Sequence, residues 1–148
     1  MVCREETLKL FDKANYIYFI VHAHSKGIMN VPSKFKVVVQ LFRDVAPKSC
    51  NKFVELCLAS DGYRKSAFTR LCKNYFIQGG RLGRRVDFFE DEIKNYIKHD
   101  KLIEFYIVRP GIIGLTNMGY QHSNDVQFYI TLNSIPGFDG KTVVIGQV

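Results

Sequence analysis

The stretch "FTRLCKNYFIQGGRLGRR", residues 68–85, holds two side chains whose chemistry can serve a ligand site. Arg70 lies at the start of a short apolar and aromatic run, and Gln78 lies near its end. A guanidinium stays charged and presents a planar fork of donors. If it is fixed in place, such a donor can stabilise charge that develops only in a transition state. The alternative is a solvated arginine on a strand, and the residues alone favour that alternative.

The cysteines and histidines do not form a pattern that predicts a metal site. Cys50 and Cys57 are seven residues apart, which places them on one helix face and favours buried thiols. His22 and His24 alternate as strand residues do. No CxxC or HxxxH spacing occurs, so we expect neither a metal nor a disulfide framework.

Short β-branched and aromatic runs predict the strands that must position Arg70 and Gln78. The expected strands cover residues 15–22, 35–42, 66–71, 75–78, 111–117, 126–132 and 141–148. Residues 93–108 leave two interpretations open, because "EIKNYIKH" fits a helical turn and "LIEFYIV" fits a strand. Arg70 and Gln78 therefore fall on two consecutive strands.

One helix is expected between the second and third strands. Its apolar stripe consists of Cys50, Phe53, Val54, Cys57 and Leu58. Pro47 fits the first turn, where its missing N–H costs nothing, and Asp44 is a candidate cap. The helix should end near "SDGY", where Gly62 can take a positive φ.

The composition indicates one globular domain over residues 1–148. Hydrophobic residues make up 47% and charged residues 24%, which excludes a disordered chain. No apolar run approaches the length of a membrane span, so no membrane partner is expected. The N-terminal "MVCREETLKL" has charges where a signal peptide needs an apolar stretch, which predicts a cytoplasmic or nuclear location. Several strands with one helix predict a mostly β, α+β fold on an antiparallel sheet or closed barrel.

The net charge of +7, from 21 basic and 14 acidic residues, allows an acidic partner such as RNA. The basic cluster Arg81, Arg84 and Arg85 lies in a glycine-containing stretch without the stacking aromatics of single-strand binders. We therefore do not expect a nucleic-acid partner.

Six segments in order resemble one known family, the cyclophilins, which are peptidyl-prolyl cis-trans isomerases inhibited by cyclosporin. They are "VVVQLFRDVAPKSCNKFVELC", "AFTRLCKNYFIQGG", "FFEDE", "GIIGLTNMG", "VQFYIT" and "FDGKTVVIGQV". The match covers about residues 35–148, with residues 16–21 as the first strand. The resemblance implies an eight-stranded antiparallel β-barrel capped by helices, with a substrate groove on its outside.

The resemblance also implies roles for individual residues. Arg70 corresponds to the catalytic arginine of the family, and Gln78 to a neighbour that binds substrate. Asn117 would present its backbone to the peptide. The apolar proline pocket would be formed by Tyr75, Phe76, Tyr129 and Phe138, and the adjoining groove would be lined by Thr116 and Gln127. No cofactor is implied, because the reaction needs only an environment that binds the twisted amide.

Several residues depart from the family pattern. A histidine before the catalytic arginine is replaced by Thr69, a tryptophan beside the pocket by Gly137, and a second histidine by Thr142. The pocket also differs at Phe76, Thr116 and Tyr129, and the segment before Gln127 is one residue longer. The sequence stops before the second helix and the last strand of the family. These changes predict reduced activity and weak cyclosporin binding.

Two functions therefore compete. The first is a divergent, monomeric prolyl isomerase that assists the folding of proline-containing proteins, favoured by Arg70, Gln78 and Asn117. The second is a catalytically weak or inactive module that binds a proline-containing protein partner, favoured by Gly137 and Thr142.

Overall fold

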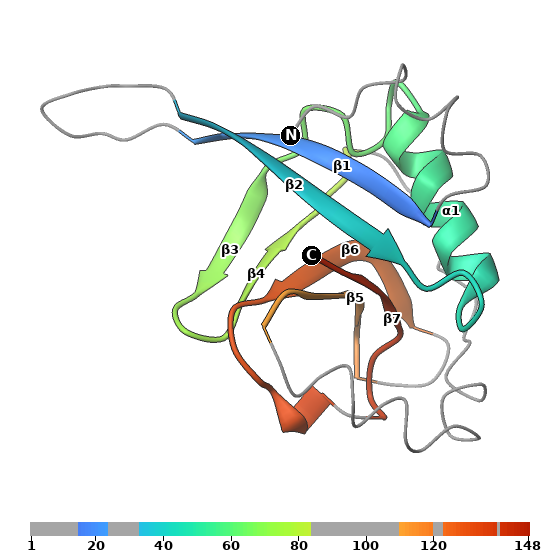
Figure 1. The fold of residues 1–148 in the computed structure, drawn as a ribbon, viewed down its shortest axis with the longest axis vertical. Helices are drawn as coiled ribbons and strands as arrows, with labels where there is room; N and C mark the ends of the chain where they lie inside the picture. The colour runs from blue at the N-terminus through green and yellow to red at the C-terminus, as the bar shows by residue number, and fades with distance from the viewer. Residues whose placement is uncertain (1–14, 24–32, 84–109, 120–122, 139) are drawn as a thin grey trace, which may run out of the picture.

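Seven β-strands and one α-helix make up the part of the chain that the structure describes, and the strands form one antiparallel sheet (Figure 1). The structure is a computed structural model that describes residues 15–23, 33–83, 110–119, 123–138 and 140–148. The strand order is β1-β2-β7-β5-β6-β4-β3. The bounds are β1 Tyr16–Ala23, β2 Ser33–Leu41, β3 Phe68–Cys72, β4 Phe76–Gly79, β5 Ile112–Asn117, β6 Asn124–Thr131 and β7 Val144–Gln147.

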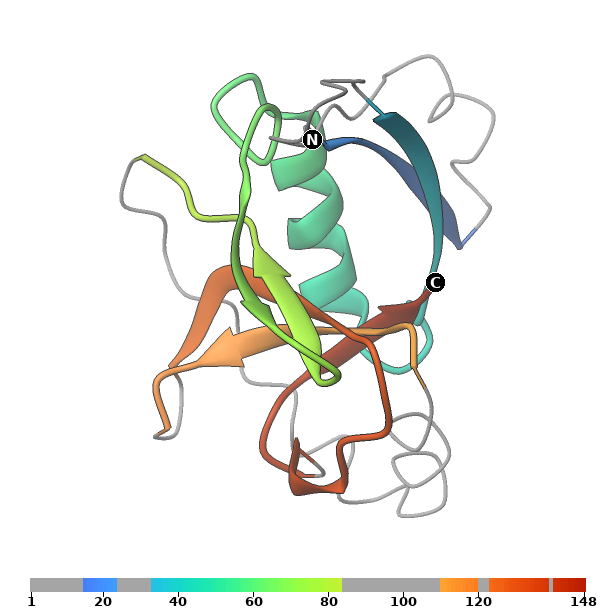
Figure 2. The same ribbon diagram turned by 90° about the vertical axis from the view of Figure 1, so that its left-hand side faces the viewer.

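The sheet curls into a half-barrel around α1, which spans Pro47–Leu58. Figure 2 shows β1 and β2 on one side of the helix and β3 and β4 on the other, with β5, β6 and β7 crossing near its lower end. Each strand predicted from the sequence corresponds to one of these strands, and the predicted fold class is confirmed. The ambiguous residues 93–108 lie outside the described residues.

No helix in the described ranges is long and apolar enough to cross a membrane.

The start of α1 differs from the prediction in one respect. Pro47 occupies the first turn as expected, but Asp44 does not cap the helix, and the residue before the helix is Ala46. The backbone N–H groups of Val45 and Ala46 both donate to the carbonyl oxygen of Phe42, at 3.1 and 2.9 Å. Ala46 itself is fully buried, so a small apolar residue fills the position where a polar cap would stand. A backbone turn therefore leads into the helix in place of a side-chain cap.

The end of α1 also follows a different principle from the one predicted. The helix stops at Leu58, and Gly62 is not among the glycines with positive φ in the described residues. A Cβ atom at Gly62 would collide with the carbonyl oxygen of Leu56, which accepts the backbone N–H of Tyr63 at 2.8 Å. Glycine is therefore needed here for close backbone approach.

The helix face toward the sheet largely matches the predicted stripe. Cys50, Phe53 and Cys57 are buried, which confirms the two cysteines as core thiols. Leu58, predicted on this face, is 43% exposed, and Leu56 is buried in its place. The helix therefore packs on the core through Leu56 and not through Leu58.

Five aromatic residues that pack together under β6 form the centre of the core. The ring of Phe128 lies 5.3–6.1 Å, centroid to centroid, from the rings of Phe19, Phe53, Tyr63 and Phe68. Phe128 has no exposed surface. The contact with Phe19 is stacked and the other three are edge-to-face, and such contacts add about 0.5–1.5 kcal/mol per pair beyond the burial of the rings.

Tyr63 connects this core to strand β6. Its hydroxyl donates to the carbonyl oxygen of Val126 on β6 at 2.5 Å. Burial, and to a smaller extent the nearby Cys57 and Asp125, raises the pKa of Tyr63 well above its usual value of 10.0. The buried phenol must therefore stay protonated to keep its bond to β6.

We predict that Tyr63→Phe lowers the free energy of unfolding by about 1–3 kcal/mol at neutral pH, because a buried carbonyl loses its donor. The difference in the free energy of unfolding between wild type and Tyr63→Phe should become smaller above a pH of about 10. There the unfolded tyrosine ionises while the folded one resists, so wild-type stability falls as pH rises. Urea unfolding of both proteins at a pH of about 8 and of about 10.5 measures the difference. Tyr16→Phe, at a tyrosine that is 45% exposed, is the control and should change little. An unchanged midpoint for Tyr63→Phe would contradict the proposed anchor.

Candidate functional site

Three neighbouring strands place a row of side chains on the outer face of the sheet. Arg70 on β3 is directly opposite Gln78 on β4, which is in turn opposite Tyr129 on β6. Residues opposite each other in adjacent strands point to the same face. Phe76 and Gln127 each lie two residues from a member of this row, so they share that face.

These side chains line a groove of about 340 Å³. The lining residues in the described ranges are Arg70, Phe76, Gln78, Thr116, Asn117, Asp125, Gln127, Tyr129, Phe138 and Thr142. All the site residues predicted from the sequence are among them except Tyr75. Tyr75 lies in the turn between β3 and β4, where its side chain is 56% exposed and its backbone bonds Cys72 and Leu132.

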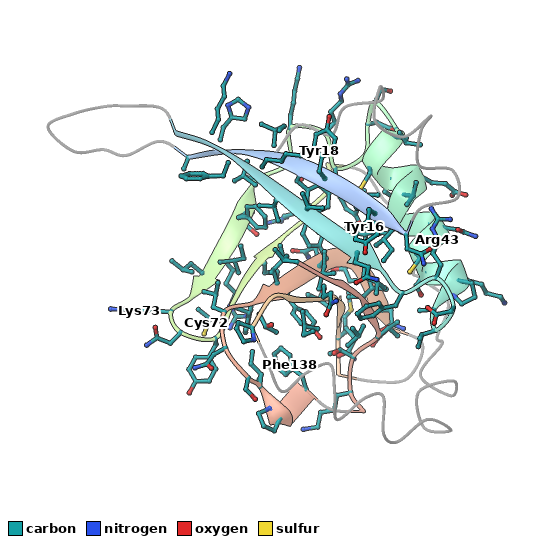
Figure 3. The ribbon with its side chains drawn as sticks, viewed as in Figure 1. Tyr16, Tyr18, Arg43, Cys72, Lys73 and Phe138 are labelled. Atoms are coloured by element: carbon teal, nitrogen blue, oxygen red, sulfur yellow. The ribbon has the colours of Figure 1, made fainter. Side chains whose placement is uncertain are left out.

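Phe76, Tyr129 and Phe138 form an aromatic cluster at one end of the groove. The ring centroids are 6.2 Å apart for Phe76 and Tyr129, 5.7 Å for Phe76 and Phe138, and 5.1 Å for Tyr129 and Phe138. Phe138 comes from the short 3-10 helix η2, Pro136–Phe138, and Figure 3 shows its ring below β5 and β6. Three rings from three elements thus make a rigid apolar wall.

Tyr129 is almost fully buried, and two neighbours explain how it fits. A Cβ atom at Gly114, its partner on β5, would collide with the Tyr129 hydroxyl and lie 2.5 Å from its Cζ atom. The missing side chain at Gly114 therefore provides the space that the tyrosine fills. The Tyr129 hydroxyl then shares a hydrogen bond of 2.6 Å with the Thr142 hydroxyl.

Amide side chains form the polar part of the groove. Gln78 Nε2 donates to Gln127 Oε1 at 3.2 Å, and Gln127 Nε2 donates to Asp125 Oδ2 at 2.8 Å. The Thr116 hydroxyl donates to the Gln127 carbonyl oxygen at 3.2 Å. The carboxylate accepts only, so it fixes the orientation of both amides in turn. Among the described residues no side-chain hydrogen bond joins Gln78 to Arg70.

Asn117 has a structural task in this arrangement. Its Nδ2 atom donates to the carbonyl oxygen of Lys141, and its Oδ1 atom accepts the backbone N–H of Gly119 at 3.0 Å. The side chain thereby ties the end of β5 to the segment that precedes β7. This cross-link holds one wall of the groove in place.

Arg70 lies at the rim of the groove with an exposed side chain. Its guanidinium carbon is 5.4 Å from the centroid of the Phe76 ring, which is a cation–π distance. The exposure of Arg70 matches the alternative that the residues alone favoured, and its role at a ligand site stays a prediction. The arginine is solvated, and an aromatic ring holds its charged end beside the groove.

The sequence did not point to Asp125 as a groove residue, and it gave Thr142 only as a departure from the family. A period of two along β6 would have found Asp125, because it precedes Gln127 and Tyr129 at intervals of two residues. Thr142 has no such signal, since it lies in the loop before β7 and meets Tyr129 only through the fold.

A curled antiparallel half-barrel with one helix, and an outer groove where an arginine flanks three aromatic rings, is the arrangement of the cyclophilin class. The sequence profile described as "Cyclophilin type peptidyl-prolyl cis-trans isomerase/CLD" matches residues 28–148. The chain belongs to this family.

Curated relatives agree with this assignment. The human "Probable inactive peptidyl-prolyl cis-trans isomerase-like 6" is 35% identical over 132 residues, covering 76% of this chain and 39% of the relative. The Rhizopus delemar "Peptidyl-prolyl cis-trans isomerase-like 2" is 32% identical over 151 residues, covering 96% of this chain and 26% of the relative. The chain thus spans well under half the length of these relatives.

Solved structures share the fold. The crystal structure of a Cryptosporidium parvum cyclophilin type peptidyl-prolyl cis-trans isomerase, determined in the presence of the dipeptide Ala-Pro, matches with a TM-score of 0.62 and 27% identity. The superposition covers 76% of this chain and 71% of that one.

We predict that Gly114→Ala disturbs the aromatic cluster, because the new methyl group must displace Tyr129 or the backbone of β5. The free energy of unfolding should fall by about 1–3 kcal/mol, as is usual when a packed site is overfilled. Gly137→Ala is the matched control, since a Cβ atom at Gly137 meets nothing within 4 Å. It should stay within about 0.5 kcal/mol of wild type. Denaturant unfolding and the ring resonances of Tyr129 report both effects, and equal behaviour of the two variants would contradict the packing described.

Proposed function

We propose that this chain is a peptidyl-prolyl cis-trans isomerase of reduced activity. It would interconvert the cis and trans forms of X–Pro bonds in peptides and assist the folding of proline-containing proteins. The observation that supports this most directly is the position of the Arg70 guanidinium over Phe76, next to the aromatic cluster. In this proposal the aromatic side chains hold the proline ring, and Arg70 donates a hydrogen bond to the amide nitrogen of the X–Pro bond.

The chemistry needs little more than these groups. An X–Pro bond rotates slowly because its C–N bond has partial double-bond character, with a barrier of about 18–20 kcal/mol. Twisting localises the nitrogen lone pair, and a fixed guanidinium can then donate a hydrogen bond to it. An interaction that exists only in the twisted state accelerates the reaction, because it does not stabilise either planar isomer.

The polar side of the groove supports substrate binding. The hydrogen bonds from Gln78 to Gln127 and from Gln127 to Asp125 hold both amides in one orientation. In this orientation the donor end of Gln78 is turned to Gln127, so its carbonyl oxygen is the end offered to a peptide N–H. Asn117 and Thr116 would guide the peptide along the opposite wall.

The expected activity is reduced because the aromatic cluster is crowded. Phe76, Tyr129 and Phe138 already lie 5.1–6.2 Å from one another, centroid to centroid. A proline ring must enter between or against these rings, and small misplacements of a substrate can cost about a hundredfold in rate.

A second candidate is a binding module with little or no catalysis. The rim position of Arg70 favours it, because the side chain is exposed and the described residues fix it through one aromatic contact only. The name of the human relative, which includes "Probable inactive", favours it as well. Such a module would bind a proline-containing protein partner through the same groove.

Exchange NMR on a short Ala-Pro peptide, with and without the chain, tests the proposal. We predict faster interconversion of the two isomers with their ratio unchanged. Arg70→Ala should lower this acceleration by about 10²–10³-fold, as expected for the loss of one preorganised donor. Arg64→Ala removes an exposed arginine outside the groove and should retain the wild-type rate.

The outcomes separate the two candidates. A folded chain that binds the peptide without accelerating exchange would reject the isomerase and favour the binding module. An Arg70→Ala variant with wild-type exchange would remove Arg70 from the mechanism. Circular dichroism of each variant shows whether the fold is retained.

We also predict weak binding of cyclosporin, because Gly137 supplies no side-chain contact beside the pocket. A Cβ atom at this position has open space around it, so Gly137→Trp can add an aromatic surface without meeting a neighbour at its base. Calorimetry should show a gain in affinity of about tenfold or more for this variant. Nanomolar binding by the wild-type chain would contradict the prediction.

The monomeric state, the single domain over residues 1–148 and the cytoplasmic or nuclear location stay predictions from the sequence.

A further inference from the structure

The groove carries a second charged side chain besides Arg70. Among the described residues that line it, only Arg70 and Asp125 have a formal charge. We infer that Asp125 selects peptides that place a lysine or an arginine roughly two or three residues from the proline. The inference rests on the proposed function, because it assumes that the groove takes a proline-containing peptide.

The register of β6 puts Asp125 in line with the rest of the site. Asp125, Gln127 and Tyr129 alternate along the strand, and all three line the groove. Four residues of strand correspond to about 13 Å between the Cα atoms of Asp125 and Tyr129. A peptide in extended conformation advances by about 3.3–3.6 Å per residue, and a long basic side chain covers part of the span. A proline against Tyr129 therefore brings a basic residue about two or three positions away within reach of Asp125.

The carboxylate is held in one position before any ligand arrives. Asp125 Oδ1 accepts the backbone N–H of Val126 at 2.7 Å, and Oδ2 accepts Gln127 Nε2 at 2.8 Å. Two oxygens have about four lone-pair sites, so acceptor capacity remains for a cation. A partner that is already ordered loses less conformational entropy on binding.

The described part of the chain supplies Asp125 with two hydrogen bonds and no ion pair. A partly buried carboxylate to which the described residues offer no cation is a suitable site for a ligand ammonium or guanidinium, because the peptide can supply the opposite charge.

The overall charge of the chain acts against this preference, and the two effects differ in range. A net charge of +7 repels cationic peptides at a distance. Salt screens such interactions beyond about 8 Å at physiological ionic strength, whereas a contact pair in the groove is screened less. The preference for a basic residue should therefore appear mainly as slower dissociation.

The test is a binding comparison of four proteins with a set of peptides that differ in one residue and in its distance from the proline. The peptides contain one central Ala-Pro unit and carry lysine, norleucine or glutamate two or three residues before or after the proline. The proteins are wild type, Asp125→Asn, Asp44→Asn and Arg70→Ala. Asp44 is an exposed aspartate outside the groove, so its replacement changes the net charge equally without touching the site. NMR titration gives the dissociation constants, and exchange spectra of the same samples give the rate.

For one of the placements we expect wild type to bind the lysine peptide about three- to tenfold more tightly than the norleucine peptide. The glutamate peptide should bind most weakly. Asp44→Asn should retain the lysine preference, and Asp125→Asn should lose it. Asp125→Asn can also reorient Gln127 and weaken both peptides, but a common loss cancels in the ratio of the two affinities.

Equal affinity for lysine and norleucine at every placement, or a preference that survives Asp125→Asn, would overturn the inference. A lysine preference without faster exchange would support Asp125 and reject the isomerase. Faster exchange without a lysine preference would support the isomerase and reject the role of Asp125. If no proline peptide binds at all, both the inference and the proposed function are wrong.

Discussion

The inward position of Phe128 is the constraint on which the groove depends. Its ring packs against four aromatic residues in the core and has no exposed surface. Because successive side chains on a strand point to opposite faces, this packing turns Gln127 and Tyr129 outward. A shift of β6 by one residue would bury polar Gln127 and expel Phe128, so burial of one ring fixes the register of the whole site. Gly80 takes part, since its φ of 81° and the closeness of the Phe128 ring leave no room for a side chain there.

The core and the groove are therefore two sides of one strand. Tyr63 bonds the carbonyl oxygen of Val126 from within, while Asp125 and Gln127 are linked to each other on the outside. Arg70 contributes to the site from the exposed side of an outer strand of the sheet. Outer strands have fewer neighbours to hold them, so the contact of Arg70 with Phe76 matters for its position more than burial does.

Local pattern predicted the elements well and the contacts between them poorly. Alternation and β-propensity found all seven described strands, and the ordered motifs found most of the groove, including Arg70, Gln78 and Asn117. The missed features depend on partners that alternation and β-propensity do not reveal. The need for glycine at Gly62 comes from a carbonyl six residues earlier, and the turn that exposes Tyr75 is bonded to Leu132. Periodicity along one segment contains no information on such partners.

The unusual residues of the aromatic cluster compensate for one another. A tyrosine in place of phenylalanine would bury a hydroxyl at a cost of about 1–3 kcal/mol if nothing received it. The Thr142 hydroxyl shares a hydrogen bond of 2.6 Å with it, and Gly114 leaves the space that the ring needs. Tyr129 therefore fits this position only together with Thr142 and Gly114. The aromatic cluster is thus fully packed, and its buried hydroxyl has a hydrogen-bond partner. The substitutions have not left empty space in it. Under the proposed function, this packing would select a ligand by its shape at the aromatic end, and recognition of charge would fall to Asp125 near the start of β6.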